Sequence, residues 1–276
     1  VQPKQVGKLI ALPPEQLLSA VNKVARTLGQ FRPTTGAPSL PAHPFDPTAP
    51  LMSASIPMII GTNLTEASFA MGRDPTVLAL DEAGVLERVK NLVPAQDAAK
   101  VLETYKRIYP VMAPSDILFR VATDRGYFLD STIQAARKAD LKRAPAFVYS
   151  FNWMQELHMD VRVARAQDAQ ERPLTAGRMH VPHGSEIAFA FGNAQLARGE
   201  NPQALASLMS EAWASFARTG NPSTTRLSWA PYDSTSRPTM IFDKQSRVEN
   251  DPRGEQRKLM LAFGSQQYGK REIPGL

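Results

Sequence analysis

The sequence contains no cysteine in its 276 residues. A disulfide framework, a thiol nucleophile and a cysteine-ligated metal site are therefore excluded, and the absence is compatible with the cytoplasm. No run of about 18 apolar residues occurs either, so we expect no membrane-spanning helix. The net charge of +6 is modest and its basic residues are scattered, which argues against a nucleic-acid partner.

The chain is 43% hydrophobic and 21% charged, a composition that can bury a sizeable core.

Proline is abundant and unevenly placed. Between residues 31 and 50, proline recurs too often for a helix or a central strand, so this stretch is predicted to be an irregular connection. The prolines concerned are Pro33, Pro38, Pro41, Pro44, Pro47 and Pro50.

Hydrophobic periodicity, together with the capping, glycine and proline residues that end helices and strands, predicts the main elements. Helices are expected at 13–30, at 115–139 with Ser115 or Asp116 as its cap, and at 202–219, with one or two more within 75–109. Strands are expected at 56–61, 146–151 and 239–242, and a long polar loop at 154–179. Gly126 is the weak point of the second helix, and Gly220 ends the third in the left-handed conformation. The core candidates are Leu78, Leu80, Val85, Leu86, Val89, Leu205, Met209, Trp213 and Phe216.

Strands alternating with helices indicate an α/β architecture. The strand at 56–61 is apolar throughout, which suits a mostly parallel sheet flanked by helices on both faces. Three strands are too few for a self-contained doubly wound sheet in a chain of this length. We therefore expect that part of the fold lies outside this chain.

Two segments carry residues suited to catalysis. Glu66 follows the strand at 56–61 after a tight turn, and the carboxyl ends of strands are where catalytic groups gather in open α/β sheets. His183 follows the long polar loop and precedes Gly184. A carboxylate that orients a histidine is the supporting pair of a nucleophilic triad. Taken alone, such a glutamate is more often a cap or a surface charge, and such a histidine more often a loop residue.

Several motifs in order resemble the C-terminal portion of the type-B carboxylesterase and cholinesterase family, from about Ile10 to about Asp243. They begin at residues 40–47 (LPAHPFDP), 57–66 (PMIIGTNLTE) and 115–116 (SD). They continue at 149–153 (YSFNW), 183–187 (HGSEI), 213–222 (WASFARTGNP), 229–233 (WAPYD) and 237–243 (RPTMIFD).

The resemblance implies an α/β-hydrolase fold and hydrolysis of carboxylic esters, with Glu66 as the catalytic acid and His183 as the base. Thr65 and Ala67 depart from the acidic residue and the glycine that are frequent in this turn. Residues 1–276 would form the C-terminal portion of one catalytic domain. Residues 1–55 would be its helix and proline-rich connection, and residues 56–276 its later strands with the acid and base.

The nucleophile of such a triad is absent from this sequence. A serine hydrolase of this fold places its serine in a G-x-S-x-G turn and draws its oxyanion hole from upstream amides, and no G-x-S-x-G occurs here. We therefore expect a partner, the N-terminal half of the same enzyme, to carry them. The chain alone is expected to be inactive. The substrate would be a small-molecule ester, and no metal or cofactor is needed.

Two other functions remain open: a non-catalytic binding or adhesion module of the same fold, and an amide or carbamate hydrolase.

Other polar residues have structural interpretations. Residues 63–65 form a glycosylation sequon, but a sugar would not fit in the turn that sets Glu66. His180 and His183 lack the further ligands of a zinc site. His43 is expected to be structural and His158 exposed. Trp153 is expected to line the substrate pocket or to pack in the core.

Overall fold

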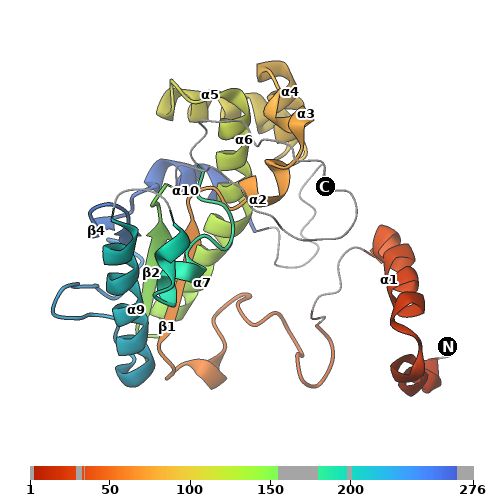
Figure 1. Ribbon diagram of the computed structural model, residues 1–276, viewed down its shortest axis with the longest axis horizontal. Helices are drawn as coiled ribbons and strands as arrows, with labels where there is room; N and C mark the ends of the chain where they lie inside the picture. Colours follow the sequence, from red (N-terminus) through yellow and green to blue (C-terminus); the bar gives the residue numbers. More distant parts are fainter. Residues whose placement is uncertain (1–2, 29–32, 34, 155–179, 198–200, 266–276) are drawn as a thin grey trace. The chain divides into compact units, whose positions relative to one another are not determined.

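The computed structural model describes residues 3–28, 33, 35–154, 180–197 and 201–265. The chain divides into two compact units, Val1–Pro44 and Phe45–Leu276 (Figure 1). The site described below lies in the second unit. Within the described ranges, no helix is long and apolar enough to cross a membrane.

The first unit is helical at its start. A 3₁₀ segment, Pro3–Ala11, precedes helix α1, Pro14–Leu28, which has proline at its first position and Glu15 in its first turn. The predicted helix at 13–30 is therefore confirmed as far as residue 28, and its last two residues lie outside the described ranges. The proline-rich stretch is irregular where it is described, with one isolated bridge between Ala37 and Leu40.

The second unit is built on a four-stranded sheet with the order β1-β2-β3-β4. β1 (Met58–Asn63), β2 (Ala146–Phe151) and β3 (Pro238–Phe242) run parallel to one another, and β4 (Arg247–Asn250) runs antiparallel to β3. The three predicted strands are confirmed, β1 beginning and ending two residues later than expected. The fourth strand was not predicted.

Helix α9, Pro202–Thr219, covers one face of the sheet (Figure 1). Met209 of α9 is buried in one cluster with Phe147 and Phe151 of β2 and Phe242 of β3. The helix was predicted with these bounds, and Gly220 ends it at a φ of 74° as expected. Trp153 belongs to the same cluster and is 1% exposed, so it is a core residue.

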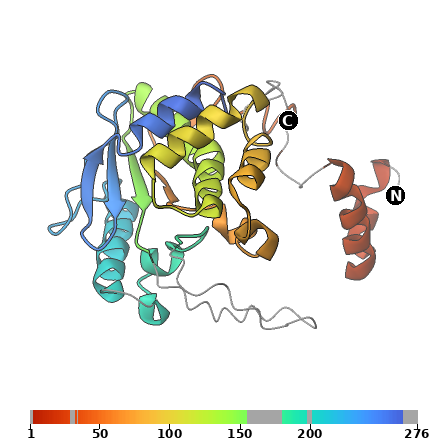
Figure 2. The same ribbon diagram turned by 90° about the horizontal axis from the view of Figure 1, so that it is seen from above.

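Helix α7, Leu129–Asp140, covers the other face. Its Ala135 packs with Ala146 and Val148, which alternate along β2 with the residues that face α9. Helix α10, Gly254–Leu261, lies on this side and runs next to α5, Ala98–Ile108, where Gln256 donates to the Tyr109 hydroxyl at 3.0 Å (Figure 2). The unit is thus a sheet between two helical layers.

A helical subcluster surrounds the start of α7. It contains α3 (Pro75–Leu78), α4 (Glu82–Val89), α5 and α6 (Pro114–Thr123), whose apolar faces share a buried cluster that includes Val85, Val89 and Phe119. A π-helical turn, Asp124–Phe128, joins α6 to α7. The remaining short segments are α2 (Ser68–Met71), α8 (Ile187–Ala190) and the 3₁₀ turns Leu51–Ser53, Ala95–Asp97 and Ala194–Leu196.

Two helix predictions were wrong in detail. The long helix begins at Pro114 after Ala113, without a side-chain cap, because proline at the first helical position supplies a preset φ and has no N–H to cap. Ser115 and Asp116 are therefore inside the helix. Between residues 75 and 109 there are three helices rather than one or two.

Candidate active site

The site begins where β1 ends. The chain turns through residues 64–66, and this turn is tied to two neighbouring segments. The N–H of Leu64 donates to the carbonyl of Phe151, at the end of β2, at 3.0 Å. Thr65 N–H donates to the carbonyl of Val181 at 3.2 Å, and Val181 N–H donates to Thr65 Oγ1 at 2.7 Å. The turn is therefore fixed to the segment that leads to His183.

Two side chains of helix α6 form hydrogen bonds with the backbone of the same turn. Arg120 donates to the carbonyl of Leu64 at 3.4 Å, and the hydroxyl of Thr123 accepts the N–H of Ala67 at 3.2 Å. Burial lowers the pKa of Arg120 from its ordinary value. Ala67 has a φ of −63°, so the glycine that is frequent at this position is not required here.

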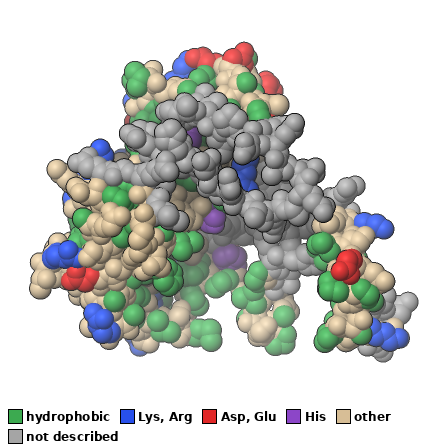
Figure 3. Space-filling model, in the orientation of Figure 1, with side chains coloured by type: hydrophobic (Ala, Val, Ile, Leu, Met, Phe, Trp, Pro, Cys, Tyr) green, Lys and Arg blue, Asp and Glu red, His purple; other side chains and the backbone are tan. Residues whose placement is uncertain are grey.

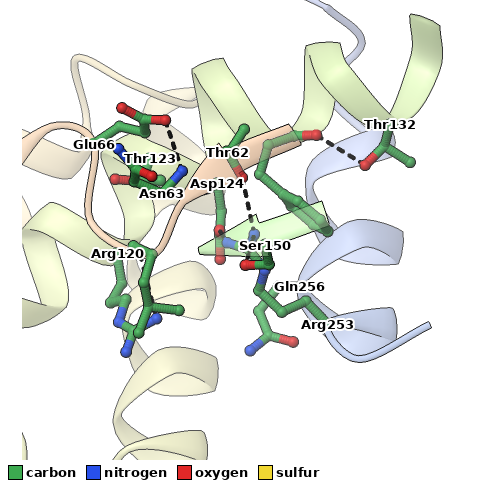
Figure 4. Close-up of polar contacts among 12 residues, drawn as sticks. Thr62, Asn63, Glu66, Arg120, Thr123, Asp124, Thr132, Ser150, Arg253 and Gln256 are labelled. Carbon is green, nitrogen blue, oxygen red and sulfur yellow. Dashed lines mark hydrogen bonds and ion pairs between the residues drawn. The ribbon is translucent and has the colours of Figure 1, made fainter. Parts of the chain in front are cut away.

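Glu66 is 6% exposed, and both oxygens of its carboxylate are used. Oε1 accepts the N–H of Asn63 at 2.7 Å (Figure 4), and Oε2 lies 2.7 Å from His183 Nδ1. Burial raises the pKa of Glu66 above its ordinary value, and the bonds from Asn63 and His183 offset part of that rise. The structure thus brings together the two residues predicted as acid and base.

His183 presents its ring at the surface. Its side chain is 58% exposed, and Gly184, at a φ of +83°, turns the chain directly after it. The ring lies 5.6 Å from that of Tyr127, from the π-helical turn, and 6.1 Å from that of Phe69. Figure 3 shows histidine side chains at the surface with hydrophobic ones beside them. Because Nδ1 faces Glu66, Nε2 is the nitrogen left to exchange a proton with a bound group.

Asn63 joins the acid to the base segment. Its side chain is buried, and Nδ2 donates to the carbonyl of Pro182 at 2.9 Å and to the carboxylate of Glu186. The amide nitrogen that would carry a sugar is therefore enclosed, which agrees with the expectation for this sequon.

His180 is not part of this pair. His180 packs its ring on Phe119 at 5.3 Å, and its Nε2 is 3.6 Å from Asp116 Oδ1. His43 belongs to the first unit, and His158 lies outside the described residues, as does nearly all of the predicted loop at 154–179. Among the residues that the structure describes, no three His, Asp or Glu side chains gather as a metal-binding group.

A second polar cluster lies on the α7 side of the sheet and was not predicted. Asp124, fully buried, accepts the Tyr105 hydroxyl at 2.7 Å and Nη1 of Arg253 at 2.6 Å. Arg253 Nη2 reaches Thr62 Oγ1 at 3.2 Å and Ser150 Oγ at 3.4 Å (Figure 4). Burial and the Asp124 charge raise the pKa of Tyr105 well above its ordinary value. The cluster ties the π-helical turn and the residue preceding α10 to β1 and β2.

Known proteins are similar to this chain in sequence. Para-nitrobenzyl esterase of Bacillus subtilis (strain 168) is 26% identical over 270 residues, which are 93% of this chain and 50% of that protein. Human carboxylesterase 5A is 27% identical over 210 residues, 71% of this chain and 34% of that protein. The chain spans half or less of the length of these relatives.

Solved structures agree with this similarity. A para-nitrobenzyl esterase superposes with a TM-score of 0.65 at 22% identity, and the carboxylesterase EST55 of Geobacillus stearothermophilus with 0.66 at 24%. Each match covers 94% of this chain and 51% of the other, so the chain contains part of an α/β-hydrolase fold. The family model described as the carboxylesterase family matches residues 2–260. This chain therefore belongs to the carboxylesterase family.

Proposed function

We propose that this chain supplies the acid, Glu66, and the base, His183, of a Ser-Glu-His triad that hydrolyses carboxylic esters. The observation that supports this most strongly is the 2.7 Å contact between a buried carboxylate oxygen and Nδ1 of a half-exposed imidazole. In such a triad the carboxylate holds the imidazole in one tautomer and stabilises the imidazolium. A binding module would have no need for this pair, so the geometry favours an enzyme.

Each group has a defined part in the reaction. As the serine oxygen attacks the ester carbonyl, its proton passes to Nε2 of His183, and Glu66 stabilises the resulting imidazolium. The bond to the alcohol then breaks and the imidazolium returns the proton to the leaving oxygen. A water molecule, deprotonated by the same nitrogen, hydrolyses the acyl-serine and restores the enzyme.

The serine and the oxyanion hole come, in this proposal, from an N-terminal half of the enzyme. Two facts support the need for it: no G-x-S-x-G occurs in the sequence, and the chain spans half of the bacterial relative. β1 is the first strand in the sheet order, and no described strand pairs with its outer edge. Its sequence, MIIGTN, has neither charge nor proline to protect an exposed edge. We therefore place the partner's contact along β1.

The test uses the assembled enzyme and 4-nitrophenyl acetate or butyrate. His183→Ala should lower kcat by about 10⁴-fold or more, because the serine then lacks a base. His180→Ala, a matched histidine change three residues earlier in the chain, should lower it by less than about tenfold. Excess chelator should leave the rate unchanged. A larger loss in His180→Ala than in His183→Ala would refute the assignment of the base.

Two further measurements separate the alternatives. Wild-type enzyme that binds esters but never turns them over would support a binding or adhesion module, and faster cleavage of an anilide or carbamate than of the ester would support an amide or carbamate hydrolase. Residues 1–276 expressed alone should be poorly soluble and inactive. A soluble monomer of this chain with full ester turnover would refute the need for a partner.

A further inference from the structure

We infer that Asn63 and Glu186 are positioning residues that hold the His183 turn against the strand carrying Glu66. This rests on the proposed function, because a positioning role needs a base to position. Neither residue supplies or accepts a proton in the reaction above. Both act through the geometry of the acid–base pair.

Asn63 contacts both sides of the pair. Its backbone N–H donates to Glu66 Oε1 at 2.7 Å, which fixes the acid. Its side-chain Nδ2 donates to the carbonyl of Pro182 at 2.9 Å, one residue before His183, and to the Glu186 carboxylate, three residues after it. One residue at the end of β1 therefore ties down both flanks of the turn that presents the base.

The chemistry of this contact requires an amide. Both partners of Nδ2 are acceptors, so the –NH₂ end must face them. Oδ1 is buried and has no hydrogen-bond partner among the described residues, so the donor end of Asn63 makes all of its side-chain hydrogen bonds there. Aspartate has the same shape, but would place an acceptor against two acceptors. Leucine would leave the Pro182 carbonyl and the Glu186 carboxylate without this donor.

Glu186 adds a charge as well as an anchor. It is half-buried at the residue before α8, and its carboxylate faces the amide of Asn63. The negative charge acts on Glu66, next to the imidazole. Besides the two members of the pair, the titratable groups that face it are Glu186 and the phenol of Tyr127, which lies beside the imidazole. Tyr149 is affected by the charges of both carboxylates. Glu186 therefore places a second negative charge near the pair as well as an acceptor for Asn63.

The test compares three variants of the assembled enzyme. Glu186→Ala removes the anchor and the charge, and should lower kcat about 10- to 100-fold while KM changes less than about threefold, because the base is misplaced and substrate binding is not. Glu186→Gln keeps an oxygen that accepts from Asn63, so kcat should stay within about threefold. Glu211→Gln, at an exposed ion pair with Arg226, is the matched control and should change neither kcat nor KM.

A second readout does not depend on turnover. The proton between His183 Nδ1 and Glu66 should give a low-field ¹H NMR resonance that is lost in His183→Ala, kept in Glu186→Gln, and broadened in Glu186→Ala. If wild type and His183→Ala hydrolyse esters equally, the proposed function fails, and this resonance still tests the positioning. If Glu186→Ala does not fold, Asn63→Asp replaces it, with the same loss expected.

Two results would overturn the inference. The first is a Glu186→Ala enzyme with wild-type kcat and an unchanged low-field resonance. The second is a Glu186→Gln enzyme that loses as much kcat as Glu186→Ala and also loses the low-field resonance, because an acceptor for Asn63 would then not be enough to position the base.

Discussion

Replacing Glu66 with glutamine separates the chemistry of the site from its packing. Glutamine has the same shape, and its Oε1 can still accept the N–H of Asn63 that lies 2.7 Å from the carboxylate. Its –NH₂ group would then face His183 Nδ1, now 2.7 Å from an acceptor oxygen. The imidazole would have to accept at Nδ1 and carry its proton on Nε2, and this tautomer cannot take the proton of a serine.

The expected loss follows from that tautomer. In Ser-His-Asp triads, the corresponding Asp→Asn change lowers kcat about 10⁴-fold with the geometry intact. Here we expect about 10³- to 10⁴-fold, somewhat less than for His183→Ala. KM should change little, because Glu66 is only 6% exposed and has little surface to offer a substrate.

Although Glu66→Gln should lower activity, it should not lower the stability of the fold near neutral pH. Burial raises the pKa of Glu66 above its ordinary value, so the folded protein binds this proton more tightly than the unfolded chain does. The favourable contribution of Glu66 is therefore complete below the unfolded value of about 4.5 and is lost as the pH rises through the folded value. Near neutral pH the ionised carboxylate opposes folding, and the neutral amide does not. Glu66→Gln should therefore melt at an equal or higher temperature at pH 7.5 and gain relative to wild type between pH 5 and 7.5.

Kinetics with 4-nitrophenyl butyrate and thermal melting at the two pH values measure both effects in the same preparations. An enzyme carrying Glu66→Gln that keeps more than a tenth of the wild-type kcat would refute Glu66 as the orienting acid. A melting temperature several degrees lower at pH 7.5, with an unchanged circular dichroism spectrum, would refute the argument from burial. A loss of both together would point to a collapsed turn, which the circular dichroism of the variant would reveal.

Further predictions concern stability and are measured by thermal melting of the assembled enzyme. Asp124→Asn should cost about 3–5 kcal/mol, because it leaves buried Arg253 without its counter-charge, whereas Lys106→Met, at an exposed pair with Glu82, should cost less than about 1 kcal/mol. Equal costs would show that Arg253 is solvated. Gly61→Ala should cost about 1–3 kcal/mol or more, since a Cβ there would lie 2.3 Å from the ring of Tyr149. Gly126→Ala, where a Cβ meets nothing within 4 Å, should be neutral or stabilising, and a loss as large as that of Gly61→Ala would contradict the steric explanation.

Sequence patterns predicted those elements whose ends are marked by local chemistry. Helix α9 was predicted to the residue, because Pro202 begins it and Gly220 ends it in the left-handed conformation. Strand β2 was predicted equally well, because its aromatic and branched residues alternate between two buried faces. Gly126, the expected weak point of the long helix, lies within the π-helical turn.

The elements and contacts that were not predicted from the sequence each have a physical reason for it. β4, with the sequence RVEN, has no apolar alternation, since it is held by backbone pairing to β3 with much of its surface exposed. The helices α3 and α4 could have been separated by their caps, because the side chains of Asp74 and Asp81 accept the N–H groups of Thr76 and Gly84. The Asp124–Arg253 pair has no local signal, because its members are 129 residues apart.

Residue patterns alone favoured a cap for Glu66 and a loop residue for His183, and their pairing was expected from the family resemblance. The reason is that the contact spans 117 residues and depends on the pairing of two strands. β1 carries the acid turn, whereas α8, just after His183, is anchored on β2, where Phe189 packs on Phe151 and Trp153 with ring centroids 5.0 Å apart in each case. Neither the attachment of the acid turn to β1 nor that of α8 to β2 can be inferred from the residues next to Glu66 or His183 in the sequence.

The register of β1 on β2 is therefore part of how the site is built. Asn63 pairs with Phe151, and Gly61 with Tyr149, whose ring occupies the space that a side chain at position 61 would need. A shift of one residue would put a side chain under that ring and would turn Asn63 toward the α7 face, away from Pro182 and Glu186. The same shift would bring Thr62 out of reach of Arg253, which contacts it from that face at 3.2 Å. Steric exclusion at Gly61 on one face and a buried polar contact on the other thus select one register, and that register places the carboxylate of Glu66 where the imidazole of His183 can meet it.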